Sequence, residues 1–238
     1  MKNRLARLAW IIIALIPALL FIAKFGGPSI LKLYVQAGIS HPENQAIFSL
    51  TPEPQIKRLV KDETYLAELK HYRLPQITIS LPKEMKAVQG ETTKYYYKRR
   101  PWRTSGSVAY LLYEKPNFFT GLFPQLSRQG IINDLEFLNR TMHARLEDIK
   151  TITDAFFVVM KGIFTPDLGD QKRLKIIKFS CEGKNGFISV NSGGKINYFD
   201  CNFFDPEGNF FKVCIRDVSS TLDLNKVCTI ISTVKLAG

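Results

Sequence analysis

The sequence has little of what metal sites and catalytic sites need. It contains only three histidines and four cysteines in 238 residues. The histidines, at 41, 71 and 143, are far apart, and no two cysteines form a C-x-x-C pair. A zinc site, a thioredoxin-like motif and a convergent histidine centre therefore have no support. We expect neither a metal nor another cofactor.

Other catalytic and binding motifs are incomplete. The stretch from Ser192 to Lys195 resembles a phosphate-binding loop, but position 189 is Ser and position 196 is Ile where that loop needs Gly and Ser/Thr. Acidic pairs such as Asp205 and Glu207 lie in expected turns without the dense oxygen ligands of a calcium loop. Neither a nucleophile–base pair nor paired carboxylates emerge, so the sequence favours a non-enzymatic protein.

The positive charge is concentrated in the first half of the chain. The formal net charge is +12, and residues 1–103 contribute 17 Lys/Arg against 7 Asp/Glu. A basic surface attracts anionic partners, which include nucleic acid, anionic lipid and acidic polymers.

The N-terminus has the pattern of a membrane anchor. Three cations, Lys2, Arg4 and Arg7, precede an uninterrupted apolar run from Leu8 to Ala23. With its flanks the segment has the roughly 20 residues that a spanning helix needs. The cations place the N-terminus in the cytoplasm, and the absence of an A-x-A-like site favours an uncleaved anchor over a cleaved signal peptide. We therefore predict a single-pass protein of a bacterial inner membrane, with its main domain in the periplasm.

We divide the chain into an anchor over residues 1–25, a Gly- and Pro-punctuated spacer over 26–53 and an exported domain over 54–238. Apolar periodicity predicts a helix over 54–72, which stops before Pro75. Alternation and turn residues predict the next elements. These are strands at 76–82, 94–97 and 108–113, a turn over 98–106 and an irregular loop over 118–123.

The rest of the domain begins with a helix. Asn133 is a candidate N-cap, and an apolar stripe runs from there to Met160. Thr151 or Thr153 could break this helix, and the segment DAFFVVM could instead be a strand. Four strands joined by hairpin turns then form a meander, and a helix opens at Thr221. Together these elements predict an α+β fold, an antiparallel sheet flanked by helices. The meander strands are 173–181, 187–191, 196–204 and 210–218.

The order of these elements resembles that of PsbP-type domains. The resemblance covers roughly residues 76–235 and is carried by the opening ITISLP, the central helix, the late meander and the closing TLDLNKVCTIISTVK. It implies a helix-flanked antiparallel sheet used as an accessory or assembly factor rather than as an enzyme. The anchor and the helix predicted over 54–72 fall outside it.

One basic and aromatic stretch, YYYKRRPWR, is the candidate binding site. Arg and Trp are enriched at binding hot spots, and Trp also suits a membrane interface. The alternatives are core tyrosines on a strand followed by an ordinary solvated loop. The candidate residues are Tyr95, Tyr97, Lys98, Arg99, Arg100, Trp102 and Arg103.

All four cysteines lie in the last third of the chain. A two-residue turn at Glu207-Gly208 would place Cys201 opposite Cys214, within reach of a disulfide. An oxidising compartment permits such a bond, and the alternative is a pair of buried free thiols.

These features favour a binding or assembly component of an envelope complex. Its partners would be the membrane itself and either anionic lipid or an acidic envelope protein. One alternative is an exported enzyme acting on an envelope polymer. The other is a nucleic-acid-binding component of a transfer or secretion apparatus, although an exported domain seldom meets nucleic acid.

Overall fold

The computed structural model describes residues 30–33, 35, 52–83, 88–89, 94–100, 103–165, 174–192, 196–218 and 220–237. For residues 88–89, 94–100 and 103–105 it describes the backbone alone. The predicted anchor, residues 1–25, lies outside this part of the chain. Within this part, no helix is long and apolar enough to cross a membrane.

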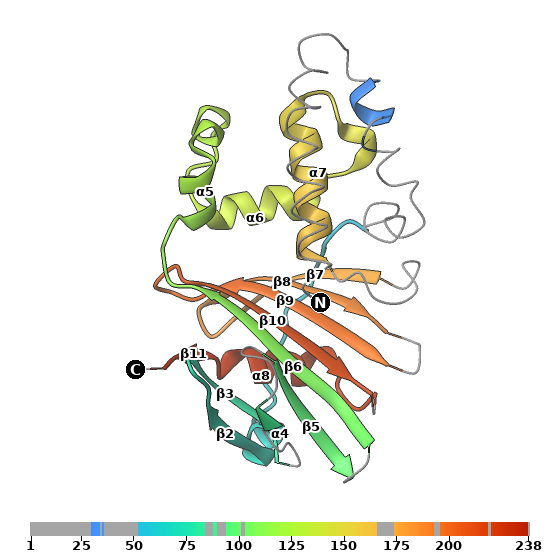
Figure 1. The fold of residues 1–238 in the computed structure, drawn as a ribbon, viewed down its shortest axis with the longest axis vertical. Helices are drawn as coiled ribbons and strands as arrows, with labels where there is room; N and C mark the ends of the chain where they lie inside the picture. Colours follow the sequence, from blue (N-terminus) through green and yellow to red (C-terminus); the bar gives the residue numbers. More distant parts are fainter. Residues whose placement is uncertain are drawn as a thin grey trace.

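An eight-stranded sheet forms the centre of the domain, in the order β1-β7-β8-β9-β10-β6-β5-β4 (Figure 1). Its strands pair antiparallel, except that the short edge strand β1 runs parallel to β7. The predicted hairpin meander corresponds to β7 through β10. The strands are β1 (Gln55–Ile56), β4 (Val88–Gln89), β5 (Lys94–Arg100), β6 (Arg103–Tyr113), β7 (Leu174–Cys181), β8 (Lys184–Asn191), β9 (Asn197–Phe204) and β10 (Phe210–Asp217).

Helices cover both faces of this sheet, which confirms the predicted α+β class (Figure 1). One face carries a helical layer of α5 (Phe118–Leu122), α6 (Asp134–His143) and α7 (Ile152–Phe164). Two short 3-10 helices, η1 (Pro124–Gln129) and η2 (Leu146–Asp148), connect them. The other face carries α8 (Leu224–Ser232), α4 (Glu63–Glu68) and a three-stranded sheet. That sheet contains β11 (Lys235–Leu236), β3 (Ile77–Pro82) and β2 (Leu69–Arg73).

The core has two main parts, one on each face of the sheet, because strand residues alternate between the two faces. A smaller third cluster includes Ile149, Ala155 and Val158. On one face, Ile188 and Cys201 pack with α8 and β3. On the other, Phe187, Phe204 and Phe210 pack with α5, α6 and α7. Each strand of the meander therefore contributes apolar side chains to both parts of the core, as expected for a sheet that is covered twice.

Capping residues explain where the two long helices begin. The Asn133 side chain accepts the backbone N–H of Glu136 at 2.9 Å and starts α6. Thr151 and Asp154 form a reciprocal capping box that starts α7. The apolar stripe predicted from Asn133 to Met160 is therefore two helices: α6 already ends at His143, and Thr151 caps the second helix instead of breaking the first. The strand alternative for DAFFVVM is wrong because this segment lies in α7.

The helix predicted over 54–72 and the loop predicted over 118–123 are wrong. Residues 54–72 form β1, irregular backbone, α4 and β2 instead of one helix. Asp62 caps a helix that begins only at Glu63, and β2 leaves the helical pattern to pair with β3. Tertiary pairing overrides the apolar periodicity here. The loop predicted over 118–123 is mostly α5.

Candidate functional site

An apolar pocket opens between α5 and α7, above β6 and β10. Its volume is about 350 Å³, which lies in the range of small-molecule sites. Twelve of the thirteen side chains that line it are apolar or aromatic, and the other is Lys212. The apolar ones are Leu111, Tyr113, Phe118, Phe119, Leu122, Phe123, Phe156, Val159, Met160, Ile163, Phe164 and Phe210.

Stacked aromatic rings hold the α5 wall of the pocket in place. Tyr113 stacks on Phe118 with ring centroids 4.1 Å apart. Phe119 stacks on Phe137 of α6 at 5.2 Å and meets Phe210 of β10 edge to face at 5.1 Å. Such contacts add to the free energy gained from burial. The wall is therefore fixed to both the sheet and α6.

A buried carboxylate fixes the first turn of α5. Asp134 accepts the backbone N–H groups of Phe119 at 3.1 Å and Thr120 at 2.8 Å. It is only 4% exposed. Because unpaired N–H groups at a helix start are satisfied in this way, Asp134 of α6 determines where α5 begins.

The floor of the pocket contains an ion pair. Lys212 Nζ lies 3.1 Å from Asp200 Oδ2, and it also donates to the carbonyl of Ile163 at 3.0 Å. Asn202 donates to the carbonyl of Phe164 at 2.9 Å. Burial alone would lower the pKa of Lys212, but the Asp200 carboxylate raises it above its ordinary value. Burial raises the pKa of Asp200, and the nearby Lys212 opposes that shift. The two side chains form a buried pair that is tied to the C-terminal end of α7.

This floor is not arranged for thiol chemistry. Cys214 Sγ lies 3.6 Å from Asp200 Oδ1. Burial and the neighbouring carboxylate raise the pKa of the Cys214 thiol above its ordinary value. A cysteine nucleophile needs the opposite shift.

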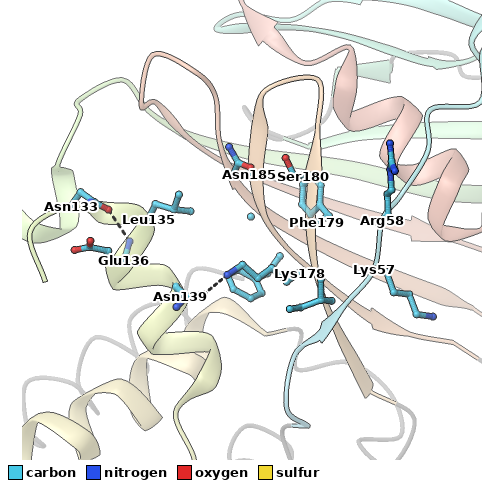
Figure 2. A pocket seen from close by; sticks show the side chains of 13 residues that line it. Lys57, Arg58, Asn133, Leu135, Glu136, Asn139, Lys178, Phe179, Ser180 and Asn185 are labelled. Carbon is cyan, nitrogen blue, oxygen red and sulfur yellow. Dashed lines mark hydrogen bonds between the residues drawn. The ribbon is translucent and has the colours of Figure 1, made fainter.

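A second hollow, the polar groove, lies beside the start of α6 (Figure 2). Its volume is about 730 Å³. It runs between the start of α6, the β7–β8 hairpin and the segment that follows β1. Its lining residues are Ile56, Lys57, Arg58, Asn133, Leu135, Glu136, Asn139, Lys178, Phe179, Ser180, Asn185, Gly186 and Phe187.

Several polar groups of the groove already bond to one another. Lys178 Nζ donates to Asn139 Oδ1 at 2.9 Å, as Figure 2 shows. Asn133 accepts the N–H of Glu136, and Glu136 accepts the N–H of Ile132 at 2.9 Å. These bonds cap α6 and join it to β7, so they explain much of the groove's polarity structurally.

The predicted basic and aromatic site lies on the β5–β6 hairpin. Lys98, Arg99 and Arg100 belong to β5, and Arg103 begins β6. The turn predicted over 98–106 is therefore wrong, because both strands extend into it and their register shifts at Lys98. Trp102 lies outside the described residues, and the side chains of Tyr95, Tyr97, Lys98, Arg99, Arg100 and Arg103 are not described. Their role in binding stays a prediction.

The predicted pairing of Cys201 with Cys214 has the wrong register. Cys201 lies opposite Val213, and Cys214 lies opposite Asp200. The turn has three residues instead of two, because Asp205 bonds to Asn209 and Gly208 takes a φ of +85°. The two cysteines consequently face opposite sides of the sheet, and both are free thiols.

Sequence reasoning did not single out Asp200 and Lys212. The available signal was a charge of each sign inside two very apolar neighbouring strands, NYFDCNFF and FFKVCIRD. Buried charges are rare unless they are paired. In the described part of the chain, no three His, Cys, Asp or Glu side chains converge in a way that could hold a metal ion.

No family model matches the sequence, and no curated protein matches it.

Proposed function

We propose that the chain is a membrane-anchored, non-catalytic binding protein that holds the acyl chain of a lipid in the apolar pocket. The observation that carries this proposal is the pocket's lining, in which twelve of thirteen side chains are apolar or aromatic. Burying apolar surface is favourable in proportion to the area removed from water.

The floor of the pocket favours a chain without charge at its buried end. Lys212 is already neutralised by Asp200 and bonded to a backbone carbonyl. An ionised group placed here would lose its hydration without gaining a free counter-charge. Leu111 and Leu122, which line the pocket, are 43% and 57% exposed. An apolar chain that entered beside them would cover surface that now faces water.

The sequence supports an acyl chain over an apolar peptide. The apolar run from Leu8 to Ala23 predicts an anchor that keeps the domain beside a bilayer, where acyl chains are abundant. We infer that the domain lies on the periplasmic face of the inner membrane. The basic first half of the chain favours anionic lipid as the source. An assembly role in an envelope complex and the PsbP-like relationship remain compatible proposals.

Blocking the pocket tests this function. In Val159→Trp the indole would fill the space between α7 and α5. Leu135→Trp is the matched control, because Leu135 also lies on a helix but lines the polar groove. Full-length protein in lipid nanodiscs is titrated with a fluorescent fatty acid, and binding to empty nanodiscs is subtracted.

We expect Val159→Trp to weaken binding at least tenfold, or about 1.4 kcal/mol, and Leu135→Trp to leave it unchanged. Equal affinity for all three proteins would refute the pocket as the site. Saturable binding of an apolar peptide, without binding of the fatty acid, would refute the acyl chain as its ligand.

A further inference from the structure

Helix α8 lies against the end of the β7–β8 hairpin. Cys181 is the last residue of β7 and lies opposite Lys184, the first residue of β8. Glu182 and Gly183 form the turn between them with φ values of +50° and +78°, as a tight two-residue hairpin turn requires. Residues directly opposite on such a pair share one face of the sheet. Cys181 and Lys184 therefore face the same neighbour.

That neighbour is α8. Lys184 Nζ donates to the carbonyl of Ser232 at 2.9 Å. Cys228 precedes Ser232 by four residues, so both lie on one face of the helix, a turn apart. Lys184 thus contacts Ser232, and its cross-strand neighbour Cys181 faces Cys228, one helical turn away. The Cys228 thiol donates a hydrogen bond to the Cys181 sulfur.

The other two cysteines have no such arrangement. Cys201 and Cys214 lie on opposite faces of the sheet, and Asp200 is the group beside the Cys214 thiol. Cys181 and Cys228 are 7% and 0% exposed and belong to one core cluster. Cys201 belongs to the same cluster, but the hydrogen bond of the Cys228 thiol goes to Cys181.

We propose that Cys181 and Cys228 form a disulfide that links β7 to α8, with a small-molecule disulfide such as oxidised glutathione as the electron acceptor. The Cys181 thiolate attacks one sulfur of the acceptor, which forms a mixed disulfide and releases one glutathione thiolate. The Cys228 sulfur then attacks the Cys181 sulfur and releases the second glutathione. Two protons and two electrons leave the protein, and one acceptor becomes two thiols.

Cys181 is suited to the first step. It is the more exposed of the two, and the hydrogen bond from Cys228 lowers the pKa of its thiol to about 7. The thiolate is the attacking species in disulfide exchange, so this shift favours reaction at neutral pH. Formation of the bond in the cell rests on the proposed export of the domain, whereas the contact between the thiols does not.

The test equilibrates full-length reduced protein in detergent with oxidised glutathione. Remaining thiols are alkylated after unfolding, and the digested protein is analysed by mass spectrometry without reduction. We expect linked Cys181 and Cys228 peptides, with Cys201 and Cys214 alkylated. Alkylation of both Cys181 and Cys228, or glutathione adducts without a link, would overturn the proposal.

A thermal melt gives a second readout. The bond would close a loop of about 47 residues, so we expect oxidation to raise the melting temperature by roughly 10 °C. Cys214→Ser should keep this rise and Cys228→Ala should lose it. An equal rise in both variants would overturn the pairing. One further outcome separates the two proposals. If the bond forms in vitro but both thiols are free in protein taken directly from cells, the pairing is supported and the proposed export is contradicted.

Discussion

The apolar pocket and the polar groove differ in the chemistry of their walls. The groove is the larger hollow, at about 730 Å³ against 350 Å³. Several of its polar groups bond to one another, through Lys178 with Asn139 and through the cap of α6. The pocket wall is apolar or aromatic at twelve of its thirteen residues, and the remaining one, Lys212, is paired with Asp200.

Because of this difference, the larger hollow is not the better binding site. A ligand in the groove would compete with the hydrogen bonds that already hold α6 to β7. Each hydrogen bond to the ligand would then replace one within the protein, so the net gain in binding free energy would be small. A ligand in the pocket would remove apolar surface from water without breaking a polar contact. We therefore place the binding site in the smaller hollow.

The largest expected effect comes from breaking the floor of the pocket. Asp200→Asn leaves the Lys212 cation buried without its counter-charge, which should lower the free energy of unfolding by about 3–5 kcal/mol. Urea denaturation measures this change. The control is Arg140→Gln, which breaks an ion pair with Asp154. The Arg140 side chain is 61% exposed. We expect less than about 1 kcal/mol there. Similar losses in the two variants would show that the floor pair is not structurally important.

A pair of glycine substitutions compares the wall of the groove with helix α5. A Cβ on Gly186, which lines the groove, would overlap the carbonyl oxygen of Asn202 in the next strand. Gly186→Ala should therefore force the strands apart and cost about 3 kcal/mol. A Cβ on Gly121 of α5 would enter open space, with no neighbouring atom within 4 Å. Gly121→Ala should be neutral or stabilising by up to about 1 kcal/mol. Thermal unfolding that ranks the two variants in reverse order would contradict the packing described for the hairpin.

Lys161, a buried lysine outside both hollows, shows how burial lowers the pKa of a lysine that, within the described residues, has no carboxylate bonded to it as Asp200 is to Lys212. Lys161 donates to the carbonyls of Ala144 at 3.0 Å and Pro52 at 3.4 Å, and burial lowers its pKa to about 8. Between pH 8 and 10.5 the unfolded chain binds more protons at this site than the folded chain. Stability should thus rise with pH across this window, by roughly 2 kcal/mol. Denaturation at several pH values should show the rise in the wild type relative to Lys161→Met. Parallel pH profiles for the two proteins would exclude a depressed pKa at Lys161.

The elements that the sequence predicts correctly are those with local signals. Asn133 and Thr151 cap their helices through contacts within four residues, and the meander strands alternate between turn residues. The prediction for 54–72 is wrong because its pairing partner, β3, and its capping residue compete with a helical apolar pattern. The cysteine register depends on one extra residue in the turn before Asn209, which composition does not reveal.

The candidate site could not be predicted in the same way. The pocket is lined from β6, α5, α7 and β10 and the loop between α5 and η1, and its aromatic side chains look like ordinary core residues in the sequence. Asp200 and Lys212 meet only after the hairpin register is known. The contact between Cys181 and Cys228 depends on how α8 packs across a sheet that precedes it by tens of residues.

Site-resolved photolabelling tests the central claim most directly. A fatty acid with a diazirine at the end of its chain is bound to the full-length protein in nanodiscs, activated by light and located by peptide mass spectrometry. The proposed function predicts labels on α5 and α7, at residues such as Phe118, Val159 and Met160, and their loss in Val159→Trp. Labels in the polar groove that persist in this variant, with none on α5 or α7, would contradict it.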